Sequence, residues 1–401
     1  MTNKSKLPIL RLKKNEDRRI RTGHPWVFSN EVDTQKTPLT DFEAGQNIRL
    51  ENSMGKPLGS AYVNPQSLIC ARLFSSDPTC QLNKSLIVHR LGIALSLREQ
   101  FFTRAYYRLV FGESDGLPGL VVDRYGDILV VQISTAGMER VKSDIIDALN
   151  TVINPQTILL RNDVSTRSME GLTSYVETVQ GEIPDTIELE ENGTLFQISL
   201  KSGQKTGWFY DQCANRGKMI KYIKDKRVLD VFSYVGAWGV QAAKNGAKDV
   251  MCVDTSDRAI DAIKANAELN KVSDKIQTAS GDAFDILKTL KAQKEKFDVV
   301  ILDPPAFIKR KKDLKQGTLA YQRVNQLAMQ VLASDGFLIS ASCSYHIGAR
   351  EFKNTLLHAS KDVNRNLQLL EYGQQNLDHP IHPALAETEY LKAIFMRVLA
   401  G

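Results

Sequence analysis

The stretch at residues 226–239, K-R-V-L-D-V-F-S-Y-V-G-A-W-G, constrains the fold more than any other part of the chain. Its apolar run at 228–231 is typical of a buried parallel strand, and 232–239 is typical of a glycine-containing turn that leads into a helix. Strand and helix patterns then alternate to the end of the chain. Such alternation predicts a mostly parallel, doubly wound α/β sheet.

The expected elements follow one another without repeats or low-complexity tracts. We expect strands at 228–231, 250–253, 276–279, 297–302, 336–341, 367–373 and 391–398. We expect a helix that follows the turn at 232–239 and ends near 245, and further helices at 257–270, 284–290, 319–333 and 349–360.

Acidic residues stand where four of these strands end, at Asp230, Asp254, Asp282 and Asp303. The carboxyl ends of parallel strands form one crevice, so we expect these residues to converge on one ligand, which we infer to be S-adenosylmethionine. Asp254 would accept the ribose hydroxyls and Asp282 would meet the adenine amine. The alternative for each aspartate is a helix N-cap.

The glycines of the first loop, Gly236 and Gly239, would let the backbone approach this ligand, and the helix after them offers amide donors. The spacing is only G-x-x-G, which is weak by itself.

Two further features suggest chemistry on a nucleobase. The prolines after Asp303 hold the chain extended and point its carbonyls outward, which suits clamping a planar base, although they could also be a stiff exit from the strand. Cys343 ends the fifth strand of the series, where a thiol is placed as a nucleophile rather than as inert packing. The other four cysteines are scattered without C-x-x-C or Cys/His spacing, so neither disulfides nor a metal site are expected.

Residues 1–74 alternate short apolar runs with turn signals, which predicts a small β-barrel. Cations and aromatic residues in the R-I-R-T-G-H-P-W stretch suggest RNA contact, and so does the basic cluster K-R-K-K. The expected RNA-binding residues are Arg19, Arg21, His24, Trp26, Lys309, Arg310, Lys311 and Lys312. The alternatives are a turn with its aromatic rings in the core and a solvated charged face.

The middle of the chain, from residue 80, reads as a small α+β unit with a helix at 86–109, a hairpin of 120–123 with 128–133, a helix at 141–149 and a strand at 157–161. We therefore expect three domains, at 1–74, 80–187 and 188–401. There is no signal peptide or membrane-length apolar run, so we expect a cytoplasmic protein. The sequence leaves open whether it forms a homodimer.

Taken together, the motifs resemble those of the PUA-domain-containing cytosine-5 methyltransferases of large-subunit (23S) ribosomal RNA, over essentially the whole chain. The matching stretches are G-H-P-W-V-F-S-N, K-T-G-W-F-Y-D-Q with the later N-R, D-V-F-S-Y-V-G-A-W-G, V-D-T-S, G-D-A-F, D-P-P-A-F and S-C-S. The chain departs from the expected pattern at Trp208, Trp238 and Cys213.

The resemblance implies a PUA barrel, a central α+β domain and a Rossmann-like methyltransferase domain that binds S-adenosylmethionine. It implies that Cys343 is the nucleophile and that Asp303 assists the base. The residues that we assign to the cofactor are Lys205, Thr206, Gly207, Asp211, Gln212, Phe232, Ser233, Tyr234, Gly236, Asp254, Asp282, Ala283 and Asp303.

The chemistry is consistent with a cysteine mechanism, because carbon 5 of cytosine is a poor nucleophile until a thiolate adds to carbon 6. Two alternatives remain at this point. D-P-P followed by an aromatic residue also fits methylation of an exocyclic amine, N6 of adenine or N2 of guanine, where no cysteine is needed. The chain could also be an RNA-binding protein without turnover.

Overall fold

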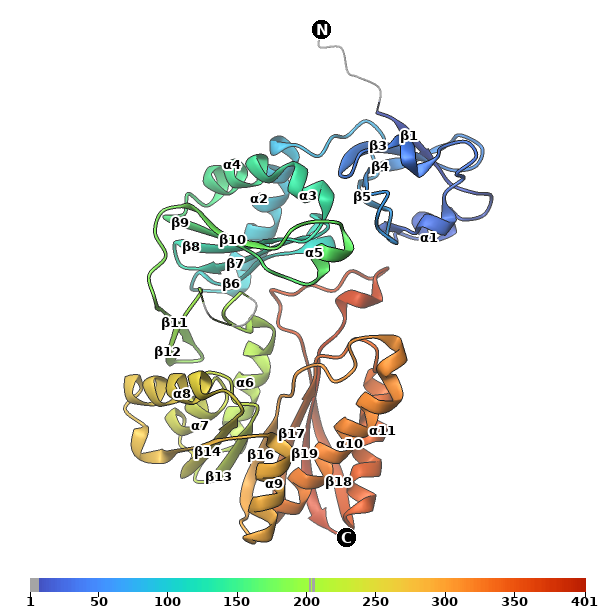
Figure 1. Ribbon diagram of the computed structural model, residues 1–401. Helices are drawn as coiled ribbons and strands as arrows, with labels where there is room; N and C mark the ends of the chain where they lie inside the picture. Colours follow the sequence, from blue (N-terminus) through green and yellow to red (C-terminus); the bar gives the residue numbers. More distant parts are fainter. Residues whose placement is uncertain (1–6, 202, 204–205) are drawn as a thin grey trace. The chain divides into compact units, whose positions relative to one another are not determined.

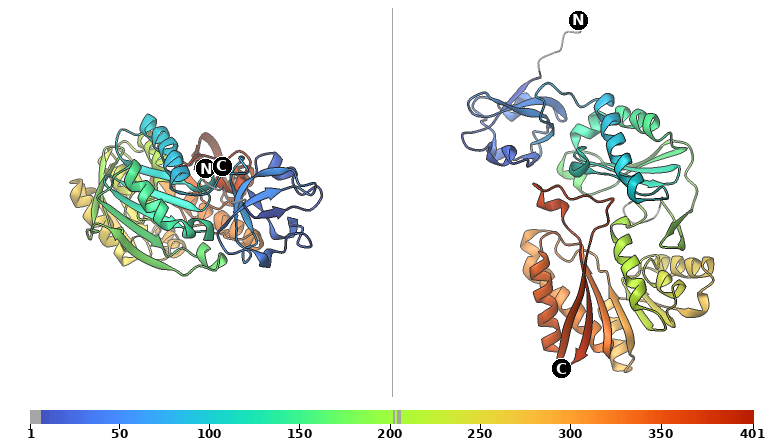
Figure 2. Two further views of the ribbon diagram at one scale, coloured as in Figure 1. Left: turned by 90° about the horizontal axis from the view of Figure 1, so that it is seen from above. Right: turned by 180° about the vertical axis from the view of Figure 1, so that it is seen from behind.

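The computed structural model describes residues 7–201, 203 and 206–401, which form two compact units (Figures 1 and 2). Unit 1 consists of Met1–Asp185, Leu200–Trp208 and Leu377–Thr388, and unit 2 of Thr186–Ser199, Phe209–Asn376 and Glu389–Gly401. No helix among the described residues combines the length and apolar character that a membrane crossing needs. The three predicted domain boundaries remain a prediction.

Unit 1 begins with a curled sheet of five short strands in the order β1-β3-β4-β5-β2. Their bounds are Ile9–Arg11 (β1), Trp26–Val27 (β2), Gln46–Glu51 (β3), Pro57–Val63 (β4) and Ala71–Ser75 (β5). Alternate residues such as Leu10, Ile48 and Val63 point into a small common core and are fully buried. A short helix, α1 (Arg18–Arg21), and a bridge from Leu12 to Val32 close the curl. The predicted N-terminal barrel corresponds to this sheet.

The second sheet of unit 1 has the order β10-β9-β8-β7-β6. Its strands are Tyr106–Phe111 (β6), Leu120–Tyr125 (β7), Ile128–Ile133 (β8), Thr157–Asn162 (β9) and Tyr175–Gln180 (β10). The helices that accompany it are Lys84–Phe101 (α2), Ala136–Arg140 (α3), Lys142–Val152 (α4) and Thr166–Met169 (α5). The predicted hairpin is confirmed, because β7 and β8 pair antiparallel.

The helix predicted at 86–109 was too long. It ends at Phe101, and the last part of the predicted span belongs to β6, which begins at Tyr106. The sequence of β6, Y-Y-R-L-V-F, is aromatic and β-branched, and the strand pairs with β7, so sheet pairing outweighs the helical spacing.

A segment from the far end of the chain, Leu377–Thr388, completes unit 1. The Arg98 side chain is fully buried and makes a bidentate ion pair with Asp115 at 2.6 and 2.8 Å. Its Nη2 also donates to the Asp378 carbonyl at 2.8 Å, while the Asp378 carboxylate accepts from the Arg108 backbone N–H at 2.8 Å. Buried polar groups thus hold this segment in place.

Unit 2 contains a seven-stranded sheet in the order β15-β14-β13-β16-β17-β19-β18. Its strands are Arg227–Val231 (β13), Asp249–Asp254 (β14), Ile276–Ser280 (β15), Phe297–Leu302 (β16), Leu332–Ser342 (β17), Arg365–Gln374 (β18) and Lys392–Ala400 (β19). The first five run parallel, and β19 lies antiparallel between its neighbours β17 and β18, as the mostly parallel prediction allows. A separate hairpin pairs Ile187–Glu191 (β11) with Thr194–Ile198 (β12).

Helices cover both faces of this sheet. They are Cys213–Met219 (α6), Gly239–Lys244 (α7), Asp257–Leu269 (α8), Ala283–Ala292 (α9), Leu314–Val331 (α10) and Ala349–Asp362 (α11). Leu229 and Val231 share a buried core with residues of α9, α10 and α11, whereas Asp230 faces the start of α7. Because β13 to β17 are parallel, their carboxyl ends lie along one edge of the sheet.

Candidate active site

The turn after β13 is held in an unusual backbone conformation. Phe232 and Tyr234 have positive φ values of 68° and 52°, in the left-handed region that side chains rarely adopt. The Ser233 hydroxyl donates to the Asp230 carbonyl and accepts from the Val253 N–H, which ties the turn to β14. Such strain persists only where the surroundings fix it, and it is common at ligand sites.

Asp254 is placed at this turn as expected for a ribose contact. Its half-buried carboxylate accepts the Tyr234 N–H at 2.9 Å on one oxygen and the Ser256 N–H at 3.0 Å on the other. A carboxylate has about four acceptor positions, so each oxygen retains capacity for a hydroxyl donor. Gly236, with φ 84°, has no side chain to obstruct the turn, and an added Cβ would come within 2.8 Å of Val240. These residues fit an adenosine-containing cofactor.

Asp230 does not reach this edge as a free ligand group. It is fully buried, and its Oδ2 accepts the Gly239 N–H at 2.9 Å beneath the start of α7. Burial raises the pKa of this carboxyl to about 7, although the Gly239 and Ser233 hydrogen bonds act in the opposite direction. Its role is therefore to support the glycine turn.

Asp282 is the N-cap of α9, which was the alternative for this residue. Its Oδ1 accepts from the backbone N–H of Phe284 at 2.9 Å and of Asp285 at 3.3 Å. The side chain is exposed at the carboxyl end of β15, and the neighbouring Ala283 is buried in the core. A cap can still offer its second oxygen to a ligand, so the adenine contact remains a prediction.

Asp303 is the most densely bonded of the predicted catalytic residues. Its Oδ1 accepts from Gln212 Nε2 at 2.8 Å and its Oδ2 from Trp238 Nε1 at 2.9 Å. Burial raises the pKa of Asp303 and the charge of Asp211 adds to this, while the Trp238 and Gln212 bonds and Arg216 oppose it. The carboxyl is thus fixed in orientation and disposed to hold a proton.

Trp238 is a site residue that the sequence reasoning missed. Its position in the glycine turn departed from the expected pattern, and this departure was the available signal. The structure gives the large side chain a role, because its indole N–H donates to the Asp303 carboxylate from this point in the turn.

Cys343 follows β17, beside the D-P-P loop that follows β16. The two strands are neighbours, and the Cys343 Sγ lies 3.9 Å from the Pro304 carbonyl oxygen. The next residue, Ser344, is buried, with its Oγ 2.8 Å from the Tyr321 hydroxyl and accepting the Ile308 N–H at 3.1 Å. This buried network fixes the backbone that presents the half-buried thiol.

The predicted cofactor residues between 205 and 212 fall in both units. Lys205 lies outside the described residues. Thr206 and Gly207 belong to unit 1, where the Thr206 carbonyl accepts from the Tyr125 hydroxyl at 3.1 Å. In unit 2, Asp211 accepts from the Tyr390 hydroxyl at 2.6 Å, so this carboxylate is partly engaged within the protein.

The expected RNA-binding residues of the first sheet make many contacts within unit 1. Trp26 Nε1 donates to Glu113 at 2.7 Å, and the Arg19 guanidinium pairs with Glu31 and lies 4.9 Å from the centre of the Phe28 ring. Arg19 also contacts the His24 ring, and burial, followed by the charge of Arg19, lowers the pKa of His24. Arg21 is exposed and pairs with Asp17.

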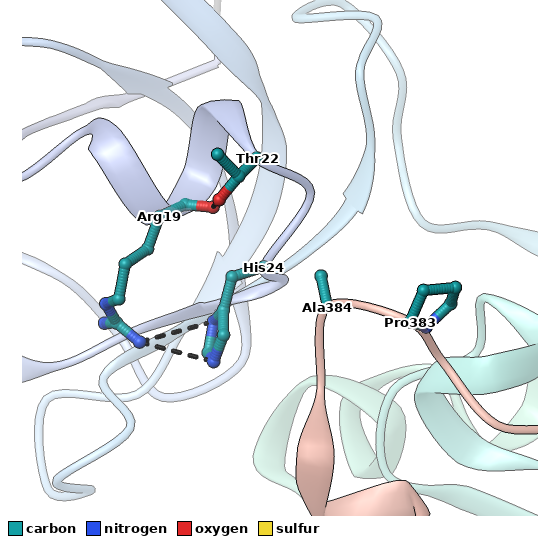
Figure 3. A pocket seen from close by; sticks show the side chains of 5 residues that line it. All are labelled: Arg19, Thr22, His24, Pro383 and Ala384. Atoms are coloured by element: carbon teal, nitrogen blue, oxygen red, sulfur yellow. Dashed lines mark hydrogen bonds between the residues drawn. The ribbon is translucent and has the colours of Figure 1, made fainter.

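Arg19 and His24 line a pocket with Thr22, Pro383 and Ala384 (Figure 3). The last two residues come from the Leu377–Thr388 segment of unit 1. The pocket therefore joins the first sheet to a part of the chain more than 350 residues later.

The second basic cluster, residues 309–312, is exposed to solvent. Lys309, Arg310, Lys311 and Lys312 are all exposed, six to nine residues after Asp303. Arg310 pairs with Asp313 at 3.1 Å, and two-thirds of its side chain is exposed. The four side chains are therefore accessible to solvent, and their contact with RNA phosphates stays a prediction.

The fold and this site define the class I, Rossmann-like methyltransferases preceded by a PUA-like domain. A model described as a PUA-like domain matches residues 10–76, and one described as conserved hypothetical protein 95 matches residues 212–370. A solved structure described as a methyltransferase complexed with SAH matches the fold with a TM-score of 0.83 and 21% identity, over 98% of this chain and 100% of the other.

Similarity to named relatives then identifies the family within this class. Ribosomal RNA large subunit methyltransferase I from Aliivibrio fischeri (strain MJ11) is 37% identical over 97% of this chain and 98% of its own. The protein of the same name from Escherichia coli O9:H4 is 35% identical over the same shares. The chain belongs to the ribosomal RNA large subunit methyltransferase I family.

Proposed function

We propose that this protein is an S-adenosylmethionine-dependent methyltransferase that forms 5-methylcytidine in large-subunit ribosomal RNA through a covalent bond to Cys343. The observation that carries the proposal is the proximity of the Cys343 thiol to the D-P-P loop, 3.9 Å from the Pro304 carbonyl, beside a carboxyl held by two side-chain donors. The names of the relatives in the family support ribosomal RNA as substrate.

Cys343 would supply the nucleophile. The thiol loses its proton, and the sulfur forms a bond to carbon 6 of cytosine, which moves an electron pair toward N3 and makes carbon 5 enamine-like. S-adenosylmethionine supplies the methyl group that carbon 5 then accepts. Loss of the carbon 5 proton and cleavage of the bond between sulfur and carbon 6 release the product and restore the thiol.

Asp303 would stabilise the adduct. A carboxyl whose pKa is raised by burial can donate a hydrogen bond, or its proton, to N3 as negative charge develops there. Gln212 and Trp238 would hold it in that orientation. The SAH complex of the similar fold and the free acceptor capacity of Asp254 support the cofactor assignment.

The target cytosine must leave its stack to reach the crevice, and the exposed cations at 309–312 would hold the neighbouring phosphates. Arg21 and the first sheet would contribute a second RNA contact. Ribosomal RNA as substrate carries with it the expectation of a cytoplasmic protein.

The test is to incubate the purified protein with undermodified large-subunit ribosomal RNA and isotopically labelled S-adenosylmethionine, and to identify the labelled nucleoside by mass spectrometry. We expect label in 5-methylcytidine for the wild type and none for Cys343→Ala. Cys80→Ala, at another half-exposed thiol, is the matched control and should retain activity. Calorimetry with SAH should give similar affinity for wild type and both variants.

A second readout follows the covalent step directly. RNA that contains 5-fluorocytidine cannot lose fluorine as a cation after methylation, so the adduct should persist on a denaturing gel with the wild type and be absent with Cys343→Ala. Label in an N-methylated purine would refute the cysteine mechanism in favour of exocyclic-amine methylation. Absence of SAH binding would instead indicate an RNA-binding protein without turnover.

A further inference from the structure

We propose that Lys392 activates Cys343, by holding an ammonium group beside the sulfur so that the thiolate forms at neutral pH. This inference rests on the proposed function of Cys343 as a nucleophile. It adds a positioning residue on β19, a strand to which the sequence reasoning assigned no chemistry.

The strand pairing puts Lys392 next to the nucleophile. β19 runs antiparallel to β17, with Lys392 opposite Ser342, the residue before Cys343. The Lys392 Nζ donates to the carbonyl of Ser344, the residue after Cys343, at 2.5 Å, and to the Tyr390 carbonyl at 2.9 Å. The lysine thus bridges to the backbone on the far side of the cysteine, and its head group is fixed there.

The Lys392 head group is partly buried, so its charge interacts strongly with neighbouring groups. Burial lowers the pKa of Lys392 to about 8, while negative charge on Cys343 and Glu389 acts in the opposite direction. Removing a lysine head group from water is unfavourable, and a thiolate nearby offsets that cost. The same attraction, seen from the cysteine, favours the thiolate over the thiol.

No other titratable group considered around Lys392 and Cys343 supplies a positive charge in place of the Lys392 ammonium. Tyr321 of α10 bonds Ser344 through its hydroxyl, and burial is the main cause that raises its pKa, so it stays neutral. Glu389 is an acid, and its negative charge would disfavour a thiolate. Glu389 is exposed, so solvent screens its charge.

The covalent step is unchanged by the proposal. The S–H bond breaks with its proton passing to water, and the sulfur–carbon 6 bond forms as the electron pair moves to N3. Lys392 remains protonated throughout and only shifts the balance between thiol and thiolate.

The test measures thiol reactivity without methyl transfer, so that it is independent of the substrate. The full-length protein is alkylated with iodoacetamide between pH 5.5 and 9.5, and the modified Cys343 peptide is quantified by mass spectrometry. We expect Lys392→Met to slow alkylation of Cys343 about tenfold at pH 7, corresponding to an apparent pKa about one unit higher. Lys392→Arg should retain fast alkylation because it keeps the charge.

Lys296 offers a matched control in the same unit. Its Nζ also donates to a backbone carbonyl, that of Gln330 at 2.7 Å, and burial likewise lowers its pKa, but it precedes β16 and lies at the opposite end of the strands. Lys296→Met should leave the Cys343 profile unchanged. An unchanged profile in a folded Lys392→Met protein would overturn the proposal.

A folding control and a comparison with product formation complete the test. If Lys392→Met does not fold, as judged by circular dichroism, Lys392→Gln takes its place and should give the same slow alkylation. If Cys343 is alkylated faster in the wild type than in Lys392→Met but no 5-methylcytidine forms, the lysine effect is supported and the proposed reaction is refuted. If the two proteins are alkylated at equal rates and label still enters 5-methylcytidine, the lysine effect is refuted and the proposed reaction is supported.

Discussion

At the scale of single residues, Asp230 has the clearest energetic signature. Its carboxyl is buried beneath the glycine turn, and within the described part of the chain its Oδ1 has no hydrogen-bond partner. Burial raises its pKa to about 7, so the folded state binds a proton more tightly than the unfolded chain, in which a pKa near 3.8 is expected. Below pH 4 both states are protonated, and above pH 7 the folded state bears the full cost of a buried charge.

We therefore predict that Asp230→Asn becomes more stable relative to the wild type as the pH rises from 5 to 8. The difference in the free energy of unfolding should grow by about 2.5 kcal/mol over this range, because the wild type loses about 1.4 kcal/mol for each pH unit between pH 5 and the folded pKa near 7. Urea unfolding followed at both pH values measures it. Asp285→Asn, at a largely exposed carboxylate on α9, should show no comparable change, and a constant gap for Asp230→Asn would contradict the prediction.

The sequence identified site residues best where a strand end carries a polar group, and less well where a contact depends on packing between elements. Asp254 and Asp303 were predicted from their strand ends, and both lie at the carboxyl edge with oxygen atoms held by donors. The inward orientation of Asp230 could not be inferred, because the alternation within one strand does not say which face α7 covers. Trp238 and Lys392 reach the site only through long side chains, so spacing along the chain gave no direct signal.

At the scale of elements, the start of α9 carries a residue with one observed role, the helix cap, and one predicted role, the adenine contact. Asp282 ends the β15 connection and caps the first turn of α9 through two backbone N–H groups. A carboxylate in the first turn is also favoured by the helix dipole. The sequence predicted the strand and helix on either side but could not decide between the cap and the adenine contact, because both require the same residue at the same position.

Two substitutions separate these roles. Asp282→Ala should lower the free energy of unfolding by about 1 kcal/mol through loss of the cap, whereas Asp282→Ser keeps a capping oxygen and should remain near wild-type stability. If Asp282 also binds the adenine amine, both variants should lose about fivefold in SAH affinity, as for one hydrogen bond. Calorimetry and urea unfolding measure the two effects. Wild-type affinity in Asp282→Ser would restrict Asp282 to capping.

At the scale of the whole molecule, neither unit is a continuous stretch of chain. Unit 1 takes Leu200–Trp208 and Leu377–Thr388 from within the sequence of unit 2. The sequence predicted simple boundaries at 74, 80 and 187, because composition and periodicity report where elements change, not where a polar segment docks. The docking of 377–388 depends on buried groups more than 250 residues away, such as Arg98 and Arg108.

This docking predicts that a change near the C-terminus loosens the middle of the chain. In Asp378→Ala the Arg108 backbone N–H loses its acceptor, and so does His379 Nδ1, which lies 2.8 Å from the other Asp378 oxygen in a buried position. Leaving such groups unpaired costs about 2 kcal/mol. We expect hydrogen exchange to accelerate in β6 and α2, where Arg108 and Arg98 lie, and to remain unchanged in β13 to β17 of unit 2.

Asp185→Ala provides the matched control, since that side chain in unit 1 is fully exposed and its contact with Lys201 is 3.6 Å long. It should leave exchange in β6 and α2 at the wild-type rate. Faster exchange confined to 377–388 in Asp378→Ala would mean that the segment only rests on unit 1. Faster exchange in β6 and α2 would mean that residues near the C-terminus are needed to stabilise unit 1. A chain cut after residue 187 would then retain the strands of that unit but lack the buried acceptors that hold them together.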